Sequence, residues 1–213
     1  MRAMKDIYLI THAEATHHLD DVVGGWFDSE LTPHGRQQAE AIATHLAQVV
    51  GQRQAEIYSS DLLRASQTAR PIGHRLGIGV SETPALREIS YGVAGGRPQA
   101  WLDERYTPAP DDDRMDHRGN IEGAESRRDV AGRVYPFLTS IMDRPAAVQI
   151  VVTHGFTASI FIAAWMKVPI EGIGFISFPT AKASITHLHQ DDFFRNRSLR
   201  SLGGTSHLSV IGE

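Results

Sequence analysis

The chain has 213 residues, of which 41% are hydrophobic and 22% are charged, and its formal net charge is −4. This composition is ordinary for a globular protein, and the charge gives no general attraction to nucleic acid or to an anionic membrane. The absence of cysteine excludes disulfides and thiolate metal sites, and no apolar run approaches the roughly 20 residues of a membrane span. We therefore expect one domain over residues 1–213, a cytoplasmic location, and neither nucleic acid nor membrane as a partner. The sequence gives no indication of the oligomeric state.

The first predicted strand is the short apolar run 7–10, which ends abruptly at Thr11-His12. A buried strand that stops at polar residues delivers their side chains to the edge of a sheet. A helix is predicted over 33–50, because Thr32 suits the N-cap and a proline suits the first helical position. Gly51 can end this helix.

The next stretch continues as strand, helix and strand. Residues 56–60 form a short predicted strand, and a helix opens near Asp61, with Pro71 expected to kink it and Gly77 to end it. A third strand is predicted near 80–83. This alternation implies a parallel sheet with right-handed crossover connections.

Periodicity disappears over residues 90–123, which are rich in glycine, proline and aspartate. Such a stretch inside a compact domain is more often a functional lid or insert than a linker. The chain then returns to regular patterns. We predict a helix over 125–142, a strand over 148–153, a helix over 159–166, and a final pair of strands at 175–178 and 183–188.

Two of the predicted strands end in the same dipeptide, since Thr153-His154 repeats the pattern of Thr11-His12. The carboxyl ends of parallel strands meet at one edge of a sheet, where open α/β sheets bind their ligands. We therefore expect His12 and His154 to lie in one ligand site.

Further motifs follow these histidines in a fixed order along the chain. They are the stretches 59–69 with Arg64, 86–92 with Glu88, 122–126, 152–155 and 204–208. Together with His12 they resemble the histidine phosphatase superfamily, also called the phosphoglycerate mutase-like family. The resemblance implies an α/β fold with three layers, α/β/α, a mostly parallel sheet and a pocket at its carboxyl edge.

The resemblance also implies a role for each of four residues. His12 would attack a phosphoryl group and form a phosphohistidine that water then hydrolyses, without a metal ion or another cofactor. Arg64 would hold the phosphoryl oxygens in its donor fork, and His154 would add a further donor. Glu88 would protonate the leaving oxygen and later take a proton from water.

The first motif departs from the family pattern, which reads Arg-His-Gly, any residue, Thr, two further residues and Asn. Here the corresponding positions hold Thr11, His12, Ala13, Ala15 and His18. The nucleophile is kept, while a charged fork is replaced by a hydroxyl that carries no charge. Loss of one preorganised donor typically costs about 100- to 1,000-fold in rate.

Three hypotheses account for this departure. Another cation fills the place of the arginine, or the substrate has less phosphate charge to hold, or the pocket is kept and the reaction is lost. The candidate cations are Arg87, Arg97, Lys182, and His17 and His18 when protonated. Of these, we assign Arg87, His17 and His18 to substrate binding together with Thr11.

The histidines near the first strand also raise the question of a metal site, because imidazole and carboxylate groups suit zinc or manganese. The gaps between His12, His17 and His18 place ligands together only on a helix, whereas this stretch runs into Gly24-Gly25 and has no helical apolar face. We therefore predict no metal ligand.

The sequence predicts a phosphatase that acts on a small phosphorylated metabolite through His12. One alternative is a mutase of the phosphoglycerate mutase type, which transfers the phosphoryl group within one substrate. The other is a catalytically weak protein that binds a ligand in the former phosphate pocket. The changed Thr11 and His18 favour the last reading, and the intact His12, Arg64 and Glu88 oppose it.

Overall fold

The computed structural model describes residues 4–211 and contains one six-stranded sheet with the order β3-β2-β4-β1-β5-β6. The first four strands in this order are parallel, and the last two are antiparallel to their neighbours. The strands are β1 (Lys5–Thr11), β2 (Ala55–Ser60), β3 (Val80–Thr83), β4 (Val148–Thr153), β5 (Ile185–Gln190) and β6 (Arg197–Gly204).

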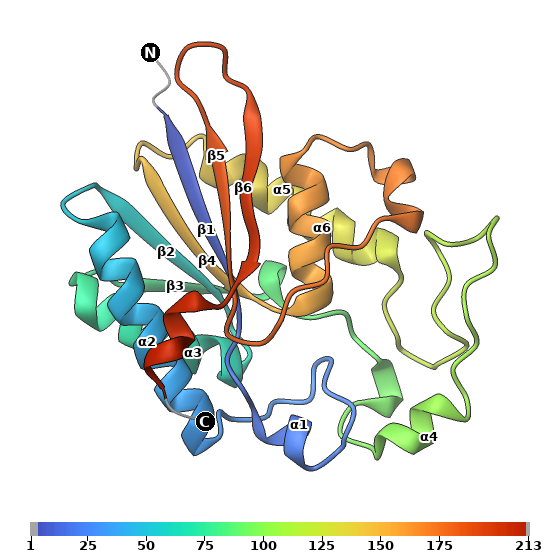
Figure 1. Ribbon diagram of the computed structural model, residues 1–213. Coiled ribbons are helices and arrows are strands. Elements are labelled where there is room, and N and C mark those ends of the chain that lie inside the picture. The colour runs from blue at the N-terminus through green and yellow to red at the C-terminus, as the bar shows by residue number, and fades with distance from the viewer. Residues whose placement is uncertain (1–3, 212–213) are drawn as a thin grey trace.

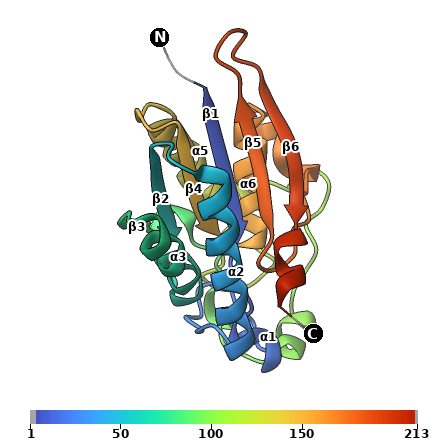
Figure 2. The ribbon, with the colours of Figure 1, turned by 60° about the vertical axis from the view of Figure 1, so that its left-hand side comes forward.

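Helices cover both faces of this sheet (Figures 1 and 2). One face carries α2 (Pro33–Val50) and α3 (Leu63–Leu76), and the other carries α5 (Arg127–Met142) and α6 (Gly155–Trp165). Because side chains alternate along a strand, Tyr8 and Ile10 of β1 join the first apolar cluster, while Ile7 and Leu9 join the second. The predicted three-layer α/β/α fold is confirmed.

Several predicted element boundaries also agree with the structure. The helix at 33–50 is α2, with the Thr32 side chain accepting from the backbone N–H of Gly35, and the strands at 80–83 and 148–153 are β3 and β4. Helix α3 ends at Gly77, whose φ of 68° lies in the left-handed region that favours glycine. Pro71 lies inside α3.

The predicted final pair of strands is wrong in one member. Residues 176–178 form no strand, and the antiparallel partner of β5 is β6, at 197–204. Strand β6 is the edge of the sheet, so it exposes Arg200, Ser201 and Leu202 and lacks the alternation of apolar and polar residues that marks a half-buried strand.

The irregular segment 90–123 contains a short helix, α4 (Gln99–Asp103), and packs through a small apolar cluster of its own. This cluster joins Ala94, Leu102 and Ile121 to Val23 from the loop after β1. The segment therefore lies beside the carboxyl end of β1, below the sheet in Figure 1. Among the helices of the described chain, none combines the length and apolar character needed to cross a membrane.

Candidate active site

Strands β1 and β4 are neighbours in the sheet, and their ends bring the two predicted histidines together. Thr11 is paired with Thr153, and the backbone N–H of His12 donates to the carbonyl of Thr153 at 2.9 Å. The rings of His12 and His154 meet edge to face with 4.9 Å between their centroids. Both side chains are buried.

The His12 ring is held in one tautomer. Its Nδ1 lies 2.7 Å from the carbonyl oxygen of Ala13, so Nδ1 must carry the proton, and the unprotonated Nε2 accepts a hydrogen bond from Nε of Arg64. Burial, followed by the charge of Arg64, lowers the pKa of His12 well below its usual range. His12 is therefore a neutral ring that presents a nucleophilic nitrogen.

The loop that follows His12 is fixed from two helices. The backbone N–H of Ala13 donates to the Thr68 hydroxyl of α3, and Thr32 at the start of α2 donates to the Glu14 carboxylate. A side chain at Gly35 would come within 2.0 Å of the Glu14 carbonyl oxygen, so α2 can approach this loop only with glycine there.

Arg64 extends from the first turn of α3 into the space beside His12 and is 1% exposed. Its Nε lies 3.3 Å from Nε2 of His12, and its two terminal nitrogens donate to the carbonyls of Phe27 and Gly25 at 2.9 and 2.7 Å. Burial lowers its pKa to about 10, so the guanidinium stays charged at neutral pH. A permanent positive charge thus lies next to the His12 ring.

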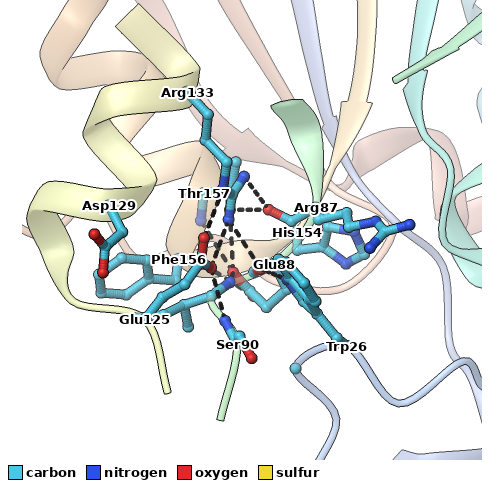
Figure 3. Close-up of polar contacts among 12 residues, drawn as sticks. Trp26, Arg87, Glu88, Ser90, Glu125, Asp129, Arg133, His154, Phe156 and Thr157 are labelled. Carbon is cyan, nitrogen blue, oxygen red and sulfur yellow. Dashed lines mark hydrogen bonds and ion pairs between the residues drawn. The ribbon is translucent and has the colours of Figure 1, made fainter. Parts of the chain in front are cut away.

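Glu88 reaches the same site from the segment after β3. Its carboxylate accepts hydrogen bonds from the backbone N–H groups of Phe156 and Thr157, at the start of α6, and from that of Ile89. Figure 3 shows Arg133 of α5 holding the backbone of this segment through the carbonyls of Arg87 and Glu88. The carboxylate is therefore placed by two helices.

His154 lies deeper than the sequence suggested. It is fully buried, its Nε2 lies 2.9 Å from the Ser60 hydroxyl, and its Nδ1 makes no hydrogen bond to any other residue of the described part of the chain. Burial and the charge of Arg64 lower its pKa well below the usual range. His154 therefore packs behind His12 as a neutral ring and does not itself line the cavity.

A cavity of about 520 Å³ opens in front of His12. Its walls bring together residues from β1, α3, the segment 90–123 and the chain before β5. Among the residues that line it are Thr11, His12, Arg64, Glu88, Thr180 and Lys182.

Two of the predicted replacement cations are neutral here. His17 and His18 lie in the short helix α1 (Thr16–Leu19) and line the cavity, but burial lowers the pKa of His17 to about 3 and that of His18 to about 4. Neither ring carries charge at neutral pH, so the expectation that they supply charge when protonated is not supported.

Arg87 does not line the cavity. Its guanidinium forms a two-pronged ion pair with Asp61 at 2.8 and 2.7 Å and lies over the ring of Trp26. Arg97 is likewise directed away, over the ring of Trp101. The assignment of Arg87 to substrate binding is therefore not supported by the geometry.

Lys182, which the sequence offered only as one of several cations, does line the cavity. Its Nζ lies 3.9 Å from the Glu14 carboxylate, and the N–H of the next residue, Ala183, donates to the His12 carbonyl at 3.0 Å. Thr11 shares a hydrogen bond of 2.9 Å with Thr180 of the same segment. The strand predicted at 175–178 was wrong. It made the residues before 183 look like a short connection between two strands, so the sequence did not indicate that they line the cavity.

The histidines around the cavity do not form a metal-binding group within residues 4–211. The group close enough for one consists of Asp6, His187 and His189, at the opposite end of β1. Both imidazoles bind one oxygen of Asp6, and Arg53 binds the other oxygen. This cluster belongs to the packing of β1 against β5.

Comparisons with known proteins agree with this geometry. The family model of the histidine phosphatase superfamily (branch 1) matches residues 7–198. A glucosyl-3-phosphoglycerate phosphatase of Mycobacterium tuberculosis is 33% identical over 180 residues, covering 80% of this chain and 78% of that protein. A probable phosphoglycerate mutase of Yersinia pestis is 27% identical over 214 residues, covering 97% and 96%.

Solved structures give the same result. A mycobacterial glucosyl-3-phosphoglycerate phosphatase in complex with VO₃ superimposes with a TM-score of 0.78 at 29% identity, covering 94% of this chain and all of that one. A protein described as mycobacterial hydrolase 1 gives a TM-score of 0.78 at 28% identity, covering 95% of this chain and 100% of the other.

Proposed function

This chain is an enzyme of the histidine phosphatase superfamily, and we propose that it hydrolyses a phosphate monoester of a small metabolite through a phosphohistidine on His12. The observation that carries the proposal is the arrangement around one cavity of a neutral His12 with its Nε2 unprotonated, a buried guanidinium on Arg64 that donates to that nitrogen, and the Glu88 carboxylate. These are the nucleophile, the charge and the proton carrier that the reaction needs.

In the first step, Nε2 of His12 forms a bond to phosphorus as the bond from phosphorus to the leaving oxygen breaks. That oxygen leaves with a proton from Glu88. The hydrogen bond from Nδ1 to the Ala13 carbonyl supports the positive charge that develops on the ring. Water then attacks phosphorus, gives its proton to Glu88, and releases inorganic phosphate and free His12.

Lys182 offers the charge that the Thr11 position lacks. It is the one lysine among the residues that line the cavity in the described chain, and its partner Glu14 is 3.9 Å away, a distance at which the ammonium group is easily drawn to a phosphoryl group. With Arg64 and Lys182 both present, two cations would face the phosphoryl oxygens. We therefore propose catalysis that needs no metal ion.

A phosphatase is favoured over the mutase because the more similar of the two relatives described above is named a phosphatase, at 33% against 27% identity. The two readings share the first chemical step and differ in whether water or a second hydroxyl receives the phosphoryl group.

We propose that segment 90–123 acts as a lid, because it lines the cavity through Tyr91 and Gln99. We also propose that the chain forms a single domain and that the protein is located in the cytoplasm.

The test is turnover of a broad panel of phosphate monoesters by protein treated with a chelator, with His12→Ala and His34→Ala in parallel. His34 is an exposed residue of α2 and serves as the matched control. We expect hydrolysis by the wild type and the control, none by His12→Ala, and an acid-labile phosphoprotein after rapid quenching. More than a few per cent of the activity in His12→Ala would refute the nucleophile assignment.

A further inference from the structure

Arg127, the first residue of α5, is half-buried and unpaired. It makes no hydrogen bond or ion pair with any other residue in the described range 4–211, and its guanidinium lies over the Phe156 ring, 4.9 Å from the centroid. Burial, followed by the charge of Arg114, lowers the pKa of Arg127. A charged group in such a place normally has a partner, because burial without one is costly.

The neighbouring arginines differ from Arg127 in this respect, because each of them has a carboxylate partner. The ion pairs are Arg114 with Asp111, Arg118 with Asp129, Arg128 with Asp116 and Glu171, and Arg133 with Glu125. Glu125 lies near Arg127 in the same wall, but its carboxylate is held by Arg133. Arg127 is therefore the cation of this group that is free to bind an incoming anion.

The position of Arg127 connects it to the phosphate cavity. Arg127 and Phe156 line a hollow of about 270 Å³, and Gly155 and Thr180 are common to the walls of that hollow and of the cavity in front of His12. On its other side, Arg127 lines a smaller hollow that shares Tyr91 with the same cavity.

Phe156 links the two places, because Arg127 lies over its ring while its backbone N–H donates to the Glu88 carboxylate, as Figure 3 shows for Phe156 and Glu88. The hollows beside Arg127 therefore adjoin the cavity in front of His12.

We propose that Arg127 binds a second anionic group of the substrate, so that the preferred substrates are phosphate monoesters that also carry a carboxylate or a second phosphate. This inference rests on the proposed function. Guanidinium binds either anion through two parallel hydrogen bonds, and stacking on an aromatic ring fixes its plane. The anion would supply the partner that the protein itself does not provide.

The experiment uses pairs of substrates that differ only in the second anion. 3-Phosphoglycerate is compared with glycerol 3-phosphate, which has a hydroxymethyl group in place of the carboxylate, and fructose 1,6-bisphosphate is compared with fructose 6-phosphate. For each compound we would measure kcat/KM with the wild type and binding by calorimetry to His12→Ala. The variants are Arg127→Gln, Arg127→Lys, and Arg200→Gln as an exposed control on β6.

We expect the wild type to prefer the doubly anionic member of at least one pair by roughly tenfold to a hundredfold, the usual value of a charged hydrogen-bonded pair. Arg127→Gln should remove this preference and leave the singly anionic member unchanged, while Arg127→Lys should keep part of it. Which pair responds identifies the anion as carboxylate or phosphate. Unchanged handling of the singly anionic member also shows that the variant is folded.

Two results would overturn the inference alone: equal use of both members in both pairs by the wild type, or a preference that survives in Arg127→Gln. A different result marks failure of the proposed function itself, namely that the wild type neither hydrolyses nor binds any member of either pair. In that case the inference falls with it.

Discussion

The hydroxyl groups of Thr11 and Thr180 lie 2.9 Å apart and join the end of β1 to the segment that precedes β5. Position 11 is the one at which the resemblance described above leads us to expect an arginine. The same segment brings Lys182 to the cavity and is fixed a second time by the hydrogen bond from Ala183 to His12. Thr11 and Lys182, which we propose supplies charge in this site, thus belong to two segments in direct contact.

Lys182→Gln should lower kcat/KM by about 10- to 1,000-fold, because it removes a charge that faces the phosphoryl group. Lys167→Gln, at an exposed lysine after α6, is the matched control and should have the activity of the wild type. Steady-state kinetics on the best substrate of the panel measures both. Equal activity of Lys182→Gln and the wild type would show that Lys182 is a bystander.

Thr11→Arg should restore activity to the Lys182→Gln variant, since it returns a guanidinium to the position where the family has one. In the wild-type background the same change should give a smaller gain, because Lys182 already supplies charge and the Thr11–Thr180 hydrogen bond is lost. The four proteins form a double-mutant cycle. Additive effects would contradict a shared role for the two positions.

The acid limb of kcat/KM should lie well below the pH expected for an ordinary histidine. Burial and Arg64 lower the pKa of His12, so the ring remains unprotonated and nucleophilic as the pH falls through about 6.5, the usual value for histidine. A pH profile measured with substrate well below KM tests this. The contrary result is an acid limb that fits a single ionisation near the usual histidine pKa. If the pKa of that limb also shifts in Arg64→Gln, the ionising group is His12, and its pKa in the substrate-free enzyme is then close to the usual value.

Much of this fold and site could be predicted from the sequence because the relevant signals are local. The Thr32 cap, the Gly77 terminus and the two Thr-His strand ends each depend on a few adjacent residues. The roles of Arg87 and Lys182 could not be predicted in this way. Which cation faces the cavity depends on Asp61 and Glu14, partners that are distant in sequence and become neighbours only in the folded chain.

The edge strand was missed for a different physical reason. β6 pairs only with β5 and faces solvent, so burial does not impose an apolar pattern on it. The depth of His154 was also beyond sequence reasoning, because a strand end predicts which edge a side chain reaches and not which of two adjacent rings lies in front.

The free energy of unfolding should fall as the medium is acidified below neutrality. The pKa is about 3 for His17 and about 4 for His18 in the folded protein, and both values lie below the pKa of histidine in the unfolded chain. At a pH between the folded and unfolded values, the unfolded chain therefore binds more protons than the folded protein. Their contribution is complete above the unfolded pKa of about 6.5 and is lost as the pH falls toward the folded values, at no more than about 1.4 kcal/mol per pH unit for each ring.

The variant that checks this is His18→Asn, which keeps an acceptor for the N–H of Ala15 and removes the titrating ring. Urea unfolding at a series of pH values should give a stability curve with a shallower slope than that of the wild type. His34→Asn, at the exposed position on α2, should leave the slope unchanged. An identical slope in His18→Asn and the wild type would mean that His18 binds protons equally in the folded and unfolded protein, so that folding does not lower its pKa.

Asp6→Asn should destabilise the fold without changing the chemistry at His12. Burial raises the pKa of Asp6, but hydrogen bonds from His187, His189 and Arg53 outweigh burial and hold the pKa well below its usual range. A lowered folded pKa contributes stability above the unfolded value of about 3.9, and this contribution is lost as the pH falls through the folded value. At neutral pH the carboxylate therefore contributes in full.

The neutral amide introduced by Asp6→Asn would leave the Arg53 charge without its partner. Since Arg53 is 33% exposed, water offsets part of the loss, and we expect a cost of no more than about 3 kcal/mol in place of the larger value for a fully buried pair. Chemical denaturation measures this cost. kcat should stay at the wild-type value, because Asp6 and His12 lie at opposite ends of β1. Unchanged stability in Asp6→Asn would show that the cluster is energetically neutral.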